Sequence, residues 1–91
     1  MRTVQREAQR AVDNGRRAVK GQVRIRVHNA TDGEMTLTAS VGRQKITVDP
    51  GKTGTYTKAN IGDSVIVYAN GKTLKSLGIL HKNVYNLTYR D

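Results

Sequence analysis

The chain has 91 residues, and its sixteen Lys and Arg outnumber seven Asp and Glu, which gives a formal charge of +9 at pH 7. It has no cysteine, which excludes disulfides, thiolate chemistry and cysteine-ligated zinc. Phe and Trp are also absent, so Val, Ile, Leu, Ala and some of the four tyrosines must build the core. A chain this short forms one small domain of marginal stability, and oligomerisation is one way to add stability. A surface of this charge attracts polyanions such as nucleic acid.

The N-terminal segment, residues 1–22, predicts a basic helical arm. Small apolar residues recur from Val4 to Val19 at spacings of three, four and seven, which is typical of one helix face. Asn14-Gly15 weakens the middle, so the arm is either one helix with a soft joint or a helix followed by a basic linker. It either packs on the rest of the protein, binds a polyanion or joins subunits. Its cations are candidate polyanion-binding residues: Arg2, Arg6, Arg10, Arg16, Arg17 and Lys20.

From Val23 onward, most apolar residues follow a period of two, the pattern of half-buried strands. Leu74, Leu77, Ile79 and Leu80 do not alternate strictly, which fits a short strand interrupted near Gly78 or a single helical turn. The first alternating run, Val23 to His28, has one apolar face and one face formed by Arg24, Arg26 and His28. The run 64–69 is apolar on both faces, which predicts a central strand covered on both sides. About seven strands are expected in all, over 23–28, 35–41, 46–48, 52–58, 64–69, 72–80 and 85–90.

Turn residues separate these runs. Asn70-Gly71 tolerates positive φ at both positions and is the strongest hairpin signal in the chain. Asp32-Gly33 is expected to take positive φ in a tight connection, and Pro50-Gly51 ends the third strand. Gly54 is expected to weaken the fourth strand or to mark a bulge.

The fold class expected from this spacing is mainly β, a small antiparallel β-sandwich with immunoglobulin-like topology, over residues 23–91. The cysteine pair and buried tryptophan of true immunoglobulin domains are absent. A small β-barrel is the alternative. The domain division is therefore a basic arm, 1–22, and a β domain, 23–91.

No catalytic, metal or cofactor site is predicted. The acidic residues after the arm fall in or beside turns, where they usually hydrogen-bond the backbone. His28 and His81 are far apart and have no carboxylate at metal-ligand spacing. The earlier glycine of a phosphate-binding loop is missing before Gly51-Lys52-Thr53 and before Gly71-Lys72-Thr73. Taken together, these observations predict that the protein is not an enzyme.

Arg24 and Arg26 extend the candidate polyanion-binding set from the arm onto the first strand. An alternative explanation is that these cations protect an edge strand from unwanted pairing. The spacing points Tyr56, Tyr85 and Tyr89 toward the core, which disfavours recognition of single strands by base stacking.

These features predict a non-enzymatic structural or interaction module that assembles with itself or a protein partner and contacts a polyanion through its arm. This arm-plus-sandwich layout resembles that of small virion and assembly proteins, an analogy of architecture alone. Alternatives are a nucleic-acid-binding β-barrel using phosphate contacts, and an extracellular or periplasmic binding domain whose leader is gone. No apolar run approaches the roughly 20 residues that span a bilayer.

Overall fold

The computed structural model describes residues 21–90, and residues 1–20 of the predicted arm, with its six candidate residues, lie outside them. The last predicted residue of the arm, Gln22, is instead the first residue of a strand, because it pairs with Asn60. Within the described residues the fold is mainly β, and the predicted number of strands is confirmed. The strands are β1 (Gln22–Asn29), β2 (Met35–Ala39), β3 (Ile46–Val48), β4 (Thr53–Asn60), β5 (Ser64–Ala69), β6 (Lys72–Ile79) and β7 (Val84–Tyr89).

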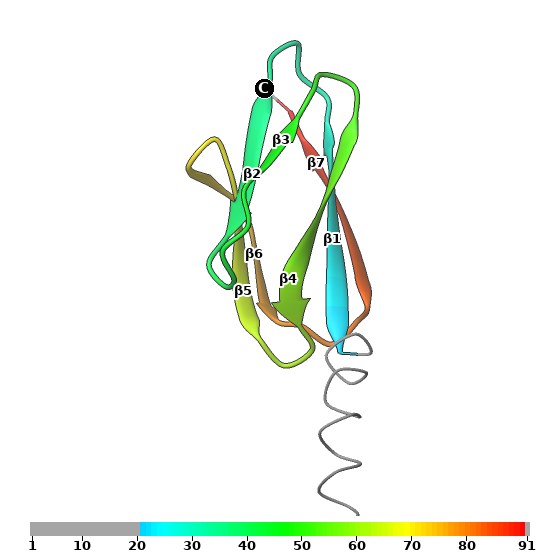
Figure 1. Cartoon of the computed structure of the whole chain (residues 1–91), viewed down its shortest axis with the longest axis vertical. Helices are drawn as coiled ribbons and strands as arrows, with labels where there is room; N and C mark the ends of the chain where they lie inside the picture. The colour runs from blue at the N-terminus through cyan, green and yellow to red at the C-terminus, as the bar shows by residue number, and fades with distance from the viewer. Residues whose placement is uncertain (1–20, 91) are drawn as a thin grey trace, which may run out of the picture.

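The seven strands form two sheets (Figure 1). Sheet A has the order β4-β1-β7, and sheet B has the order β3-β2-β5-β6. β1 is therefore the middle strand of sheet A, hydrogen-bonded on both sides. β2 and β5 are the two inner strands of sheet B.

The prediction that all strands pair antiparallel is wrong at one place. β1 and β7 are parallel, in register from Arg24 opposite Val84 to Asn29 opposite Tyr89. The other four pairings are antiparallel. Parallel pairing becomes available because β1 and β7 are far apart in sequence, joined through the whole of sheet B rather than by a hairpin.

The distribution of strands between the sheets also differs from the expected immunoglobulin-like topology. In the constant-type immunoglobulin domain, the first strand shares a four-stranded sheet with the second, fourth and fifth. Here the first strand shares a three-stranded sheet with the fourth and seventh. The chain crosses between sheets after β1, after β3, after β4 and after β6.

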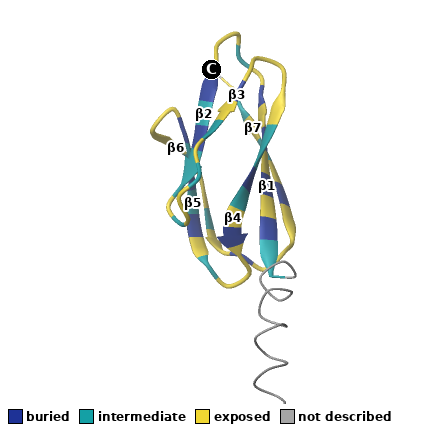
Figure 2. Cartoon of the chain, in the orientation of Figure 1, coloured by how far each residue is buried: buried dark blue, intermediate teal, exposed yellow. Residues whose placement is uncertain are grey.

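The core is formed by the inward side chains of both sheets. In β1, buried and exposed residues alternate along the strand, with Val23, Ile25 and Val27 fully buried (Figure 2). Met35, Leu37, Val65 and Val67 of sheet B belong to the same cluster. The alternation follows from the strand geometry, which turns successive side chains to opposite faces. The predicted inward orientation of Tyr56, Tyr85 and Tyr89 is confirmed, with Tyr89 only partly buried.

β5 differs from its prediction in one respect. It is an inner strand of sheet B, but only its Val65, Val67 and Ala69 face is fully covered. Ile66 and Tyr68 on the other face are half-buried. The apolar character of both faces predicted full cover on both sides, whereas the core cluster lies on one side only.

The hairpin turn at Asn70-Gly71 is confirmed, with φ of +52° and +79°. The prediction for Asp32-Gly33 is wrong, because neither residue has positive φ. A buried side chain organises this connection instead. The amide of Asn29 donates to the carbonyls of Gly33 (2.8 Å) and Val48 (3.0 Å), and its oxygen accepts from the Thr31 backbone N–H (3.0 Å).

Gly54 is not the position of the irregularity in β4. It pairs regularly with Val27, and the register shift lies nearer the end of the strand, opposite the Val23 to Ile25 segment. A Cβ on Gly54 would collide with the Val48 side chain of β3. The glycine is therefore explained by close approach of β3 to β4.

Asn29 is the one fully buried residue of residues 21–90 that does not belong to the hydrophobic core cluster, and its replacement tests its role in the loop. We expect Asn29→Ala to lower the free energy of unfolding by about 1–3 kcal/mol, because the buried Val48 carbonyl and the partly buried Gly33 carbonyl lose their donor. Urea unfolding measures this. The control is Asn83→Ala at an exposed loop position, which should change stability by less than about 0.5 kcal/mol. Equal stability of the two variants would contradict the role assigned to Asn29.

The hydroxyl of the fully buried Tyr56 donates to the backbone carbonyl of Val41, and burial raises the Tyr56 pKa above its ordinary value of 10.0. The folded state therefore holds this proton more tightly than the unfolded chain. The resulting stability is complete below pH 10.0 and is lost as pH rises through the raised pKa.

We therefore expect Tyr56→Phe to cost about 1–2 kcal/mol near neutral pH, with a difference from the native chain that shrinks above about pH 10. Urea unfolding across alkaline pH measures both effects. Tyr68→Phe, at a half-buried tyrosine, is the control and should cost about 0.5 kcal/mol or less near neutral pH. A Tyr56→Phe deficit that grows with pH would contradict the assigned direction.

Candidate polyanion interface

Three basic side chains lie in a row on the outer face of sheet A. Arg24, Arg26 and His28 are the exposed residues of β1, and we call them the basic stripe. Strand geometry spaces their Cα atoms by roughly 6.7 Å, since each residue advances the chain by about 3.3–3.4 Å. The predicted outward orientation of Arg24 and Arg26 is thus confirmed.

Both neighbouring strands contribute polar residues beside the stripe. Arg26 lies opposite Thr55 of β4 and Asn86 of β7. His28 lies opposite Thr53 and Thr88, and its Nδ1 is 3.1 Å from the Thr53 hydroxyl. Hydroxyl and amide groups therefore flank the cations on both sides. Such groups commonly accompany Arg and Lys where proteins contact phosphate oxygens.

No carboxylate of the described residues lies in a strand of sheet A. The acidic residues in this part of the chain lie in the loops, at Asp32, Glu34, Asp49 and Asp63. Asp63 accepts a hydrogen bond from the Asn60 backbone N–H (2.9 Å), which is the turn role expected from the sequence. The positive potential over the stripe is therefore not offset by an anion on the same face.

The topology rules out the edge-protection explanation for these cations. An edge strand has unpaired backbone groups on one side, and charged side chains discourage another chain from pairing there. β1 has no such side, because β4 and β7 flank it. Arg24 and Arg26 consequently need another explanation, either solvation of an exposed sheet face or contact with a partner.

Of the remaining basic residues of residues 21–90, Lys58 is exposed on β4 of the same sheet, near the register shift opposite the Val23 to Ile25 segment, and the others lie outside the strands of sheet A. Lys72 and Lys75 are exposed on β6, in the other sheet. The Lys82 ammonium lies 5.0 Å from the centre of the Tyr85 ring, and the Tyr85 hydroxyl accepts from the His81 backbone N–H (2.9 Å). Lys82 thus lies in the β6–β7 connection, with its ammonium group against the Tyr85 ring.

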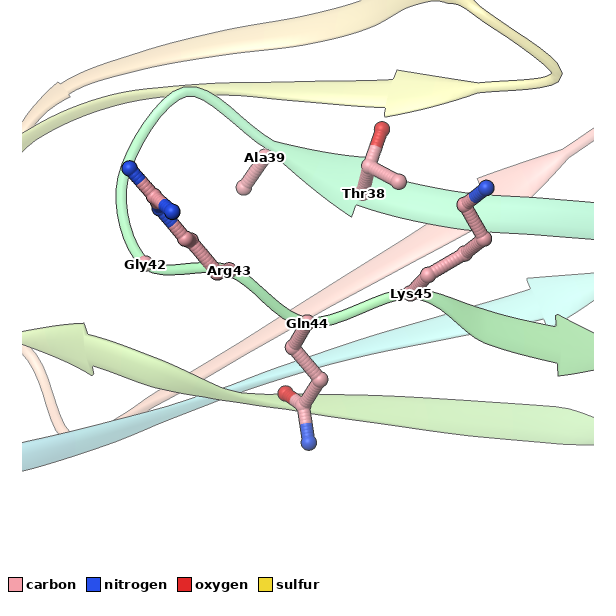
Figure 3. Close-up of a pocket in the computed structure, with 6 residues that line it drawn as sticks. All are labelled: Thr38, Ala39, Gly42, Arg43, Gln44 and Lys45. Carbon is pink, nitrogen blue, oxygen red and sulfur yellow. The ribbon is translucent and has the colours of Figure 1, made fainter.

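A second feature is a pocket of about 330 Å³ beside the β2–β3 connection, lined by Thr38, Ala39, Gly42, Arg43, Gln44 and Lys45 (Figure 3). The side chains of Arg43 and Lys45 lie at opposite ends of the pocket. Gln44 points away toward β4, where its carbonyl oxygen accepts from the Thr57 backbone N–H (2.8 Å). The cations do not converge, and we assign no ligand to this pocket.

Residues 21–90 contain no group of three His, Asp or Glu side chains arranged to hold a metal ion. This part of the chain also contains no helix long and apolar enough to span a membrane. Comparison of the chain with protein-family models, curated proteins and solved structures found no match.

The sequence pattern identified the cations of the stripe but not their flanking residues. The position of Thr53 and Thr55 beside His28 and Arg26 depends on the pairing of β1 with β4. Asn86 and Thr88 lie beside the stripe because β7 pairs in parallel with β1. No sequence pattern near these residues predicts that pairing. Residue spacing within one strand cannot show which strand lies beside it.

Proposed function

We propose that this protein is a non-enzymatic interaction module that binds polyanions through the outer face of sheet A and assembles with copies of itself. The observation that supports the binding proposal best is the position of Arg24 and Arg26. They lie on the exposed face of a middle strand, in a sheet whose strands contain no carboxylate, and protection of an edge does not explain them.

The chemistry of this face fits a phosphate backbone rather than bases. Guanidinium groups form charge-assisted, bidentate hydrogen bonds with phosphate oxygens. The flanking threonine and asparagine side chains can add neutral hydrogen bonds to the same oxygens. Base stacking needs exposed aromatic rings, and Tyr56, Tyr85 and Tyr89 point inward. We therefore infer that binding is largely independent of base sequence.

We further propose that the two sheets pack as a β-sandwich. Each sheet has its own hydrogen-bonded ladder, and inward residues of both sheets share one core cluster. In this architecture the outer face of each sheet is presented to solvent as a nearly flat surface. Such a surface suits contact with an extended polymer.

The arm adds six cations in the sequence before β1. Gly21, where the arm joins the described chain, accepts a hydrogen bond from the Ile61 backbone N–H (2.8 Å) at the end of the molecule where β1 begins. We propose that the arm and the basic stripe act on the same polyanion, since they are consecutive in the chain.

Three double variants of the full chain, each lacking two positive charges, test the binding proposal. Arg24→Gln with Arg26→Gln alters the stripe, Arg16→Gln with Arg17→Gln alters the arm, and Lys72→Gln with Lys75→Gln alters β6. Fluorescence anisotropy with labelled DNA and RNA across a range of salt concentrations measures binding. We expect the stripe variant to bind more weakly for every sequence, with a log–log salt slope shallower by about two, roughly one per phosphate contact.

The β6 variant is the control for the loss of net charge alone, and we expect it to bind nearly as the native chain does. An equal loss in the stripe and β6 variants would mean that net charge, not the face of sheet A, determines binding. Absence of binding by the native chain at low salt would reject the polyanion proposal altogether.

A further inference from the structure

The free edge of β7 has a regular set of unpaired backbone groups. The Arg24 N–H donates to the Asn83 carbonyl and the Ala30 N–H donates to the Tyr89 carbonyl, both across the β1–β7 ladder. Backbone groups of successive residues point to opposite sides of a strand. The N–H and C=O groups of Val84, Asn86 and Thr88 therefore point away from β1, and in residues 21–90 no strand pairs with them.

The other three sheet edges of the described residues each have a feature that discourages pairing. β3 has only three residues and is followed by Asp49-Pro50. β4 is covered near its middle by Gln44, which binds the Thr57 N–H. β6 carries the exposed Lys72 and Lys75, and its pairing with β5 contains two register shifts. Short length, cover, charge and bulges are the usual means of protecting an edge.

β7 has none of these features. Its six residues contain no charged residue, proline or glycine, and its pairing with β1 shows no register shift. Val84 is 40% exposed at its start, and Leu87 and Tyr89 are only partly buried. An uncharged, regular strand edge with exposed apolar residues is a template for another strand.

We propose that β7 pairs antiparallel with β7 of a second copy of this chain, on a two-fold axis that passes through Asn86. In this register Val84 lies opposite Thr88 of the other copy, Tyr85 opposite Leu87, and Asn86 opposite itself. Residues opposite each other with their backbone groups turned inward exchange both hydrogen bonds. The unpaired N–H and C=O groups of Val84, Asn86 and Thr88 are then all satisfied.

A second copy fits this edge better than a different strand because the edge is complementary to itself. In two-fold pairing a strand faces its own residues in reverse order. The three outward residues, Val84, Asn86 and Thr88, form no charged pair in this arrangement. No cation lies within either paired strand, and the nearest ones, Lys82 and Arg90, lie just outside its two ends, where each faces the other across the axis. Their repulsion weakens the dimer at low salt. The amides and hydroxyls on the outer face can also form hydrogen bonds across the junction.

Pairing joins two copies of sheet A into one six-stranded sheet with the order β4-β1-β7-β7-β1-β4. Because the axis is perpendicular to the sheet, both basic stripes lie on the same face. This inference deepens the assembly part of the proposed function, since it names the partner and the surface. It does not require that the stripe bind a polyanion.

The interface is small, because six residues span only about 20 Å. Stable protein interfaces bury roughly 1,200–2,000 Å², and a single strand edge buries less. We therefore expect a weak dimer that dissociates on dilution, and a polyanion that spans both stripes should strengthen it.

Sedimentation velocity of the full chain over a range of concentrations tests the proposal. We expect a monomer–dimer equilibrium in the native chain. Asn86→Pro removes the N–H on the axis, and its ring lies on the free side of the strand, where proline is tolerated. We expect a dimer dissociation constant about tenfold to a hundredfold higher, with circular dichroism unchanged.

Asn86→Lys is the second variant and does not depend on tolerance of proline. It places two like charges opposite each other, so we expect severalfold weaker association at low salt and partial recovery at high salt. Ser76→Lys adds the same charge to the exposed edge of β6 and should associate as the native chain does.

Amide hydrogen exchange locates the contact. Val84, Asn86 and Thr88 should be protected at high protein concentration and exchange rapidly in Asn86→Lys. A native chain that is monomeric at every concentration would overturn the proposal, as would a dimer unaffected by both Asn86 variants. The stripe variant Arg24→Gln with Arg26→Gln should still dimerise, which separates a failure of assembly from a failure of polyanion binding.

Discussion

The structure depends on β1 being paired on both sides while only one of its faces is covered. Val23, Ile25 and Val27 are fully buried against the residues of sheet B, and their burial holds the two sheets together. The strand geometry that buries these three residues necessarily turns Arg24, Arg26 and His28 to the outside. The packing of the core and the candidate binding surface thus both follow from the alternation of apolar and basic residues along β1.

Much of this arrangement is predictable from the sequence because it is local. The two-residue period identifies most of the strands and the inward and outward residues of β1, and Asn70-Gly71 identifies its hairpin turn. β6 is the exception, since its apolar residues do not alternate. These signals depend only on side chains a few residues apart. The apolar residues of β5 were a weaker guide, since Ile66 and Tyr68 are half-buried in a sheet with the core on one side.

What the sequence does not show is which strands are neighbours. The parallel pairing of β1 with β7 arises after the chain has passed through sheet B, and it places Asn86 and Thr88 beside the basic stripe. The same pairing makes β1, which carries Arg24 and Arg26, a middle strand rather than an edge strand. Asn29 is a similar case, because its role depends on the Val48 carbonyl, nineteen residues away in the chain. Which distant strands become neighbours depends on how the apolar residues of all the strands pack together in the core, not on the sequence of any one strand.

The parallel alignment of β1 and β7 also has a mechanical consequence. The described chain enters at Gly21, beside the start of β1, and leaves at Arg90, beyond the far end of β7, so its ends lie at opposite ends of the molecule (Figure 1). A pulling force applied to these ends would load the β1–β7 hydrogen bonds in shear, all at once, instead of opening them one after another. The fold should therefore resist stretching along this direction more strongly than its modest size suggests.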